Sequence, residues 1–263
     1  MTLPLCLDHL SLVDLTALEL AEVAAKLGFA RVSLFITPLP LSPALDLTTN
    51  PPALLALRRA MAADGLKAGV IEPFMLDTAT DWELLQRSAD VAAELGGCVN
   101  ALGFDPEPAR LEDSLARLAA MARKAGTAMV IEAYPLSQIR TQAEALAYAA
   151  ALGPDIGLCV DVLHVIRSGG TWDDVAALPQ DRIRHVQLND GPLQPPQDRF
   201  HEAVAGRLPP GAGEFDLRAL LPRLPAGAVL AVEAPFQAPT GLTPLSRGRI
   251  LVDATREMLR GAS

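Results

Sequence analysis

Eight short apolar segments alternate with helix-forming segments along the 263 residues of this chain. The alternation predicts an α/β fold, a single-domain (β/α)8 TIM barrel over residues 1–263. The length agrees, because such barrels typically take about 250 residues. A doubly wound open sheet alternates in the same way, but it requires a glycine-rich phosphate loop after the first strand. The segment Leu7–Ser11 contains no such loop, so the barrel is favoured.

Apolar runs locate the strands, and capping signals locate many of the helices. A Thr followed three residues later by an acidic residue is typical of a helix start, and this spacing occurs at Thr16, Thr80, Thr141 and Thr171. Glycines end several helices, where a left-handed residue closes the last turn. The predicted strands are 3–9, 31–36, 66–72, 98–103, 127–132, 157–161, 182–188 and 228–233. The predicted helices are 16–28, 53–64, 80–96, 111–124, 141–152, a short one from 171, 216–224 and 245–259.

Composition narrows the functional classes. Half of the residues are apolar and the net charge is −9, with few and scattered Lys and Arg residues, so we expect no nucleic-acid partner. No apolar run reaches the ~18 residues of a membrane helix, and the N-terminus lacks the basic region of a signal peptide. Three separated cysteines indicate buried thiols in a reducing cytoplasm. Apolar helix faces are consistent with a homo-oligomer.

Polar residues gather where the predicted strands end, and (β/α)8 barrels carry their active sites at this end. These residues are His9, Glu72, Glu132, Asp161 with His164, Gln187 and Glu233. Three carboxylates and an amide lie on four consecutive strands, and the carboxylates would repel one another in a partly desolvated mouth without a cation. Oxygen donors suit a hard divalent ion. The sequence therefore predicts one divalent metal ion, Mn²⁺ or Mg²⁺, with Co²⁺ as a further candidate.

Taken in order, these segments resemble the xylose isomerase-like sugar phosphate isomerases and epimerases. The segments that carry the resemblance are Ile131–Glu132, Asp161–His164, His185–Gln187, Val232–Pro235 and the Pro/Gly-rich loop Arg207–Glu214. The family binds its metal through Glu, Asp, His and Glu at the ends of strands five to eight. The resemblance thus implies metal ligation by Glu132, Asp161, Gln187 and Glu233, with Glu132 and Glu233 also acting as acid and base.

Gln187 departs from the family, because most members carry His at this position. The hydroxypyruvate isomerase branch is similar in using Gln. An amide oxygen in place of imidazole should favour Mg²⁺ or Mn²⁺ over Zn²⁺. The resemblance also implies that His164 hydrogen-bonds a substrate oxygen. Arg207 could clamp a carboxylate, phosphate or hydroxyl oxygen from its loop, and His9 and Glu72 are further substrate-facing candidates.

The implied activity is a metal-dependent isomerase or epimerase acting on a small sugar, keto sugar or hydroxy-keto acid through an enediolate. A metal-dependent dehydratase of the inosose or dehydroshikimate type is an alternative, because both reactions begin with loss of a proton beside a carbonyl. A non-catalytic sugar-binding barrel is a further alternative. An endonuclease is disfavoured, since the chain has four His residues and a net charge of −9. The expected partner is a small carbohydrate or keto acid.

Overall fold

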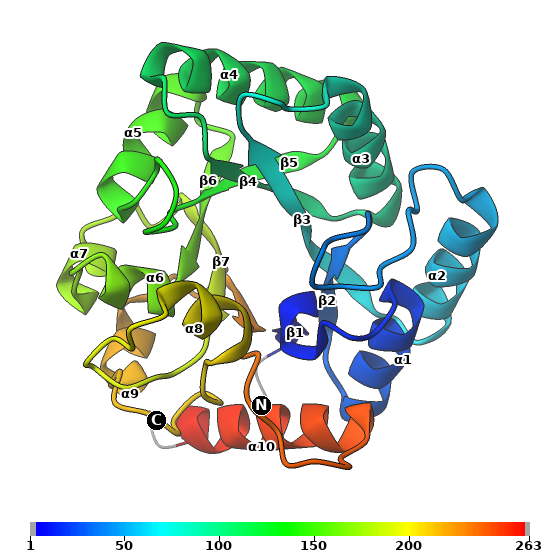
Figure 1. Ribbon diagram of the computed structural model, residues 1–263, viewed down its shortest axis with the longest axis vertical. Helices are drawn as coiled ribbons and strands as arrows, with labels where there is room; N and C mark the ends of the chain where they lie inside the picture. The colour runs from blue at the N-terminus through cyan, green and yellow to red at the C-terminus, as the bar shows by residue number, and fades with distance from the viewer. Residues whose placement is uncertain (1–3, 261–263) are drawn as a thin grey trace.

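The computed structural model describes residues 4–260, and the predicted fold class is confirmed: eight parallel strands close into a barrel ringed by helices (Figure 1). Each strand pairs with the next along the chain, and β8 pairs with β1. The strands are β1 Leu5–Leu7, β2 Arg31–Phe35, β3 Lys67–Leu76, β4 Cys98–Gly103, β5 Ala128–Glu132, β6 Ile156–Asp161, β7 Ile183–Leu188 and β8 Val229–Val232. Leu3, the first residue of the predicted first strand, lies outside the described residues.

Ten α-helices and two 3-10 helices connect and cover the strands of residues 4–260. The α-helices are α1 Ala17–Leu27, α2 Pro51–Ala63, α3 Trp82–Leu95, α4 Pro108–Ala125, α5 Gln142–Leu152, α6 Val162–Arg167, α7 Trp172–Ala176, α8 Arg199–Ala205, α9 Leu217–Leu220 and α10 Pro244–Arg260. The 3-10 helices are η1 His9–Leu12 and η2 Leu221–Arg223. Short α6 and α8 were not predicted, because one or two turns give too little apolar periodicity to detect.

The capping predictions are confirmed at Thr16, Thr141 and Thr171, where the side chains of both partners form the expected hydrogen bonds. The prediction at Thr80 is wrong. The hydroxyl of Thr80 donates to the carbonyl oxygen of Asp77. The N-cap of α3 is Asp81, whose carboxylate accepts two backbone N–H groups at 3.0 Å. An Asp is at least as good an N-cap as a Thr, so the helix starts one residue later.

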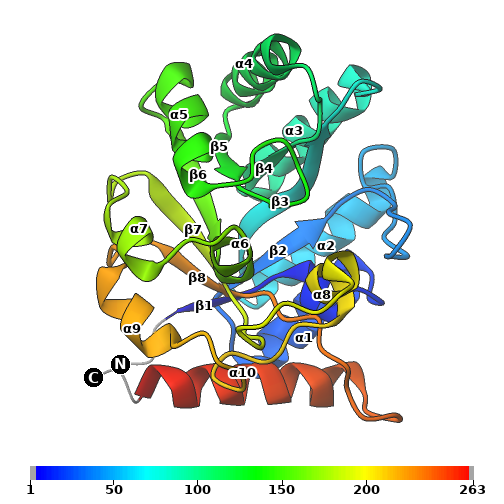
Figure 2. The same ribbon diagram turned by 60° about the vertical axis from the view of Figure 1, so that its left-hand side comes forward.

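Most of the apolar core lies between the strands and the helices, while the barrel axis holds a small cluster of Val70, Val130 and Cys159. Helix α10 packs against α1 (Figures 1 and 2), and Gly248 permits this contact, since a Cβ there would lie 2.5 Å from Leu27 Cδ1. Among residues 4–260, we find no helix with the length and apolar character needed to span a membrane. Polar side chains fill the barrel above the axial cluster.

Candidate active site

Four strands deliver the predicted metal ligands to one end of the barrel. Glu132 ends β5, Asp161 ends β6, and Gln187 lies in β7, where it pairs in register with Asp161. Glu233 follows β8 directly, and its backbone N–H donates to the carbonyl oxygen of Leu188. All four predicted ligands are buried. The alternation of strand faces therefore directs them into the mouth of the barrel, as the sequence predicts.

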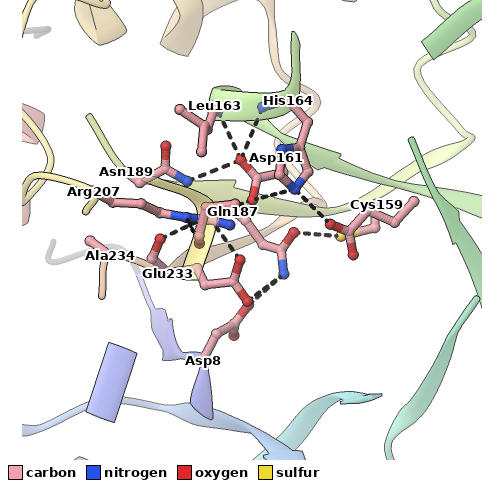
Figure 3. A network of polar contacts seen from close by, with 12 residues as sticks. Asp8, Cys159, Asp161, Leu163, His164, Gln187, Asn189, Arg207, Glu233 and Ala234 are labelled. Carbon is pink, nitrogen blue, oxygen red and sulfur yellow. Dashed lines mark hydrogen bonds and ion pairs between the residues drawn. The ribbon is translucent and has the colours of Figure 1, made fainter. Parts of the chain in front are cut away.

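Arg207 lies between two of these carboxylates (Figure 3). Its Nη1 donates to Asp161 Oδ2 at 2.6 Å and to Glu233 Oε2 at 2.9 Å. Its Nε donates to the carbonyl oxygen of Ala203 in α8 at 2.7 Å. Arg207 is 2% exposed and is engaged by both carboxylates, so it is not a solvated loop residue. A substrate contact by Arg207 stays a prediction.

Gln187 connects Glu233 to Asp8 and to Cys159. Its Nε2 donates to Glu233 Oε1 at 3.0 Å and to Asp8 Oδ2 at 3.2 Å. Its Oε1 accepts from Cys159 Sγ at 3.2 Å (Figure 3). In this orientation the amide nitrogen faces the carboxylates. To offer Oε1 to a cation, the terminal amide has to rotate, so ligation by Gln187 stays a prediction.

Glu132 belongs to a second chain of contacts. Asn100 in β4 donates through Nδ2 to both Glu132 and Glu72, and the Glu72 bond is 3.1 Å long. His164 Nε2 lies 3.4 Å from Glu132 Oε1 and 3.6 Å from Asp161 Oδ2. The amide of Asn100 thus joins the carboxylates of Glu72 and Glu132, and the imidazole of His164 lies between the carboxylates of Glu132 and Asp161.

Glu72 and His9 lie differently from the sequence prediction. Strand β3 continues to Leu76, so Glu72 is inside the strand and does not end it, although its carboxylate still reaches the mouth. Both ring nitrogens of His9 contact the backbone: Nε2 lies 2.9 Å from Leu15 O, and Nδ1 accepts the N–H of Phe35 at 2.9 Å. The substrate-binding role predicted for His9 has no support in this geometry. The ring instead ties η1 to β2 and to the segment before α1.

Three residues of the site were given no role by the sequence prediction: Asp8, Asn100 and Asn189. Asp8 Oδ2 accepts from His185 Nε2 at 3.0 Å as well as from Gln187. Asn189 Nδ2 donates to Asp161 Oδ1 at 3.0 Å. The sequence signal for Asp8 was face alternation, which places Cys6 and Asp8 on the same face of the first strand. In the structure this face is the inner one, and the two side chains are hydrogen-bonded.

The carboxyl groups of the mouth differ in the direction in which their pKa values are shifted. Burial alone raises the pKa of Asp161, but the adjacent Arg207 guanidinium outweighs it and brings the pKa to about 2. Burial raises the pKa of Glu72 well above its usual value, and the nearby Asp8 carboxylate adds to this. Burial also raises the pKa of Glu233, although Arg207 opposes it. If all the carboxyl groups of the mouth were ionised, their charge would exceed what one guanidinium can neutralise.

The residues present fit a divalent metal ion. The buried carboxyl groups of the mouth are Asp8, Glu72, Glu132, Asp161 and Glu233. Two groups bring their ligand atoms within 4.8 Å of one another: Glu132 with Asp161 and His164, and Asp8 with Glu72 and Glu233. The buried Glu72 Oε1 has no hydrogen-bond partner among residues 4–260. A hard cation would compensate both the excess charge and this oxygen. Three predicted ligands are divided between the two groups: Glu132 and Asp161 are in one, and Glu233 is in the other. Gln187 is in neither.

A cavity of about 300 Å³ opens onto these groups. Its charged and imidazole-bearing lining residues are Glu72, Glu132, His164, Arg207 and Glu233. Its apolar lining includes Phe35, Leu41, Met75, Phe104, Tyr134 and Phe200. Asp161, Gln187 and His9 do not line it. The cavity therefore offers a substrate three glutamates, a histidine and an arginine, together with apolar groups.

The family described as "Xylose isomerase-like TIM barrel" matches residues 21–235. The chain belongs to this family. A 3-dehydroshikimate dehydratase of Pseudomonas aeruginosa is 30% identical over 221 residues, which are 77% of this chain and 33% of the relative. The chain thus spans about a third of the length of the relative that it matches.

Two solved structures show the same fold. One is a xylose isomerase-like TIM barrel/4-hydroxyphenylpyruvate dioxygenase fusion protein, with a TM-score of 0.80 and 21% identity, covering 100% of this chain and 43% of that one. The other is the IOLI protein, which has a bound zinc atom, with a TM-score of 0.79 and 17% identity, covering 99% of both chains. These likenesses support the barrel, and the predicted family is confirmed by the match over residues 21–235.

Proposed function

We propose that this xylose isomerase-like barrel is a metal-dependent dehydratase that removes water from a small cyclic hydroxy-ketone of the dehydroshikimate kind. The observation that carries the proposal is the cavity itself, where Glu132 and Glu233 border one space together with His164 and Arg207. An elimination needs a base for a carbon-bound proton and a donor for the leaving oxygen. Glu132, at the end of β5, and Glu233, just after β8, can supply this pair.

The chain's residues divide the reaction between them. One glutamate takes the proton from the carbon beside the carbonyl, and the bond electrons move to form an enolate. The hydroxyl group on the next carbon then leaves as water, after accepting a proton from the second glutamate. His164 can hydrogen-bond a substrate oxygen, and Arg207 holds Asp161 and Glu233 in position. A divalent ion bound by the carboxylates would stabilise the negative oxygen of the enolate.

Two observations favour elimination over the isomerisation or epimerisation that the sequence analysis ranked first. The relative that is 30% identical is named a 3-dehydroshikimate dehydratase. The cavity wall is largely apolar, with Phe35, Met75 and Phe104 among its lining residues. Such a wall suits the carbon face of a ring better than an open-chain sugar, whose hydroxyl groups would lose their hydrogen bonds to water. Isomerase or epimerase activity stays the second candidate, because it begins with the same proton abstraction.

The test is a substrate screen in D₂O with Mn²⁺ or Mg²⁺, read by NMR. The protein is incubated with 3-dehydroshikimate, with keto sugars and with hydroxy-keto acids. We expect a new carbon–carbon double bond and loss of the hydroxyl-bearing carbon signal with 3-dehydroshikimate. Conversion of a keto sugar into an isomer or epimer, with no elimination from the cyclic ketone, would favour the second candidate. No turnover of any compound would instead support a non-catalytic barrel.

A further inference from the structure

The opposite end of the barrel holds a second cavity, of about 210 Å³. It lies at the amino ends of the strands, as six of its lining residues indicate: Arg31, Gly69, Cys98, Ala128, Arg184 and Val229. Arg31, Cys98, Ala128 and Val229 are each the first residue of a strand. The proposed dehydratase chemistry uses none of these groups. This basal cavity is therefore separate from the mouth in both position and composition.

Two arginines line the basal cavity, Arg31 from β2 and Arg184 from β7. Arg31 Nη1 donates to the carbonyl oxygen of Ala68 at 3.0 Å. Arg184 lies across β6, and a Cβ at Gly157 would be 2.5 Å from Arg184 Cδ, so glycine at this position makes room for the arginine. The register of β6 and β7 shifts between Leu158 and Cys159, beside Arg184. The side chain of Arg184 thus packs against β6 at Gly157.

Neither guanidinium is neutralised within the part of the chain that the structure describes. No residue between 4 and 260 forms an ion pair with Arg31 or Arg184, and the lining residues include no Asp or Glu. The nearby Asp155 is already bound by Arg123 through two bonds of 2.7 and 2.8 Å. Two half-buried cations without counter-ions are unexpected in a chain with a net charge of −9. Their charge and planar donors match a small oxyanion.

We propose that the basal cavity binds a small oxyanion of the phosphate or sulfate type between Arg31 and Arg184. Each guanidinium can direct N–H groups at oxygen atoms of one ion, and the buried walls contributed by Gly69, Val70 and Val130 reduce the competition from water. The volume accommodates an ion of this size. Binding here needs neither the carboxylates nor the metal site of the mouth, so it does not depend on the proposed dehydratase function.

Isothermal titration of the whole protein with inorganic phosphate, repeated with sulfate, tests this site. We expect saturable binding of one ion per chain. Arg31→Gln and Arg184→Gln should each weaken it by about tenfold or more, because each removes charge-assisted hydrogen bonds. Arg87→Gln is the matched control, since Arg87 is exposed and its loss changes the net charge equally. Circular dichroism of each variant reports whether it folds.

Three outcomes would overturn the proposal. The first is no saturable binding of either ion to the folded wild-type protein. The second is binding that survives both Arg31→Gln and Arg184→Gln unchanged, which would indicate that the ion occupies the mouth beside Arg207. The third is an equal loss in Arg87→Gln, which would indicate a response to net charge alone. If one cavity variant fails to fold, the other one and the control still decide the question.

Discussion

The two halves of the barrel contribute to the mouth in different ways. Strands β5 to β8 bring Glu132, Asp161 and Glu233 in at or just past their carboxyl ends, each after an apolar run. Strands β1 to β4 contribute Asp8, which follows β1, Glu72, which lies within β3, and Asn100, which lies within β4. The first set borders the cavity or binds Arg207. In the second set Asp8 and Asn100 bind other side chains, and of its three residues only Glu72 borders the cavity. The comparison suggests that the second half carries the chemistry and the first half orients it.

The largest expected effect tests the second half of the barrel, β5 to β8, to which the chemistry is assigned. Glu132→Gln and Glu233→Gln should each lower kcat by about 10²–10⁴-fold, because each removes an acid/base group while keeping the shape of the side chain. Steady-state rates on the substrate identified by the NMR screen provide the measurement. Glu83→Gln, on the exposed first turn of α3, is the control and should change little. Near-wild-type rates in both glutamate variants would remove the acid/base assignment.

The same comparison explains how much of the site the sequence could predict. Glu132, Asp161 and Glu233 were found because apolar β-strand runs end at a charged residue and barrel chemistry lies there. Asp8 was missed because its neighbour His9 is the more conspicuous residue, although face alternation points Asp8 inward. Asn100 lies in the middle of a strand, where an amide has no distinguishing pattern. Its role depends on side chains from β3 and β5, and such contacts between strands are not encoded locally.

An intermediate effect on kcat tests the first half of the barrel, β1 to β4, which orients the catalytic groups. Asn100→Ala removes the donor that Glu72 and Glu132 share, so we expect kcat to fall by about 10–100-fold, as when a supporting partner of a metal ligand is lost. Metal content after chelation and refilling should fall in parallel. The matched control is Asn50→Ala, which removes the N-cap of α2 in the same half of the barrel. It should lower stability with kcat unchanged. An unchanged kcat in Asn100→Ala would show that Asn100 does not orient the catalytic groups, and the chemistry would then depend on β5–β8 alone.

A smaller effect tests Gln187, which contacts both halves through Glu233 and Asp8. In the wild-type protein, refilling after chelation should restore most activity with Mg²⁺ or Mn²⁺. Gln187→His should retain metal binding but shift the preference toward Zn²⁺, because imidazole suits that ion better than an amide oxygen does. The relative activity with each ion is the measurement. Tightest activation of the wild type by Zn²⁺, or no change of preference in the variant, would argue against ligation by Gln187.

The smallest effect on catalysis is expected at His9, a residue of the first half of the barrel whose role is structural. Burial lowers the pKa of His9 from 6.5 to about 4, because the enclosed ring resists a charge. Between these values the unfolded chain binds more protons than the folded one. The stability contributed by His9 is therefore complete above pH 6.5 and is lost as the pH falls toward 4, by about 3 kcal/mol at most.

Urea unfolding of the wild type and of His9→Gln, from pH 7 to pH 4, measures this loss. The variant should be less stable than the wild type at pH 7, and the difference should shrink as the pH falls, since only the wild type has a buried imidazole to protonate. His201→Gln, which changes an exposed histidine, should follow the wild-type profile. At neutral pH the activity of folded His9→Gln should stay near that of the wild type, because both ring nitrogens of His9 contact the backbone and the ring does not line the cavity. A parallel pH profile with a large loss of kcat would give His9 a place in the site after all, and the division between the two halves would fail.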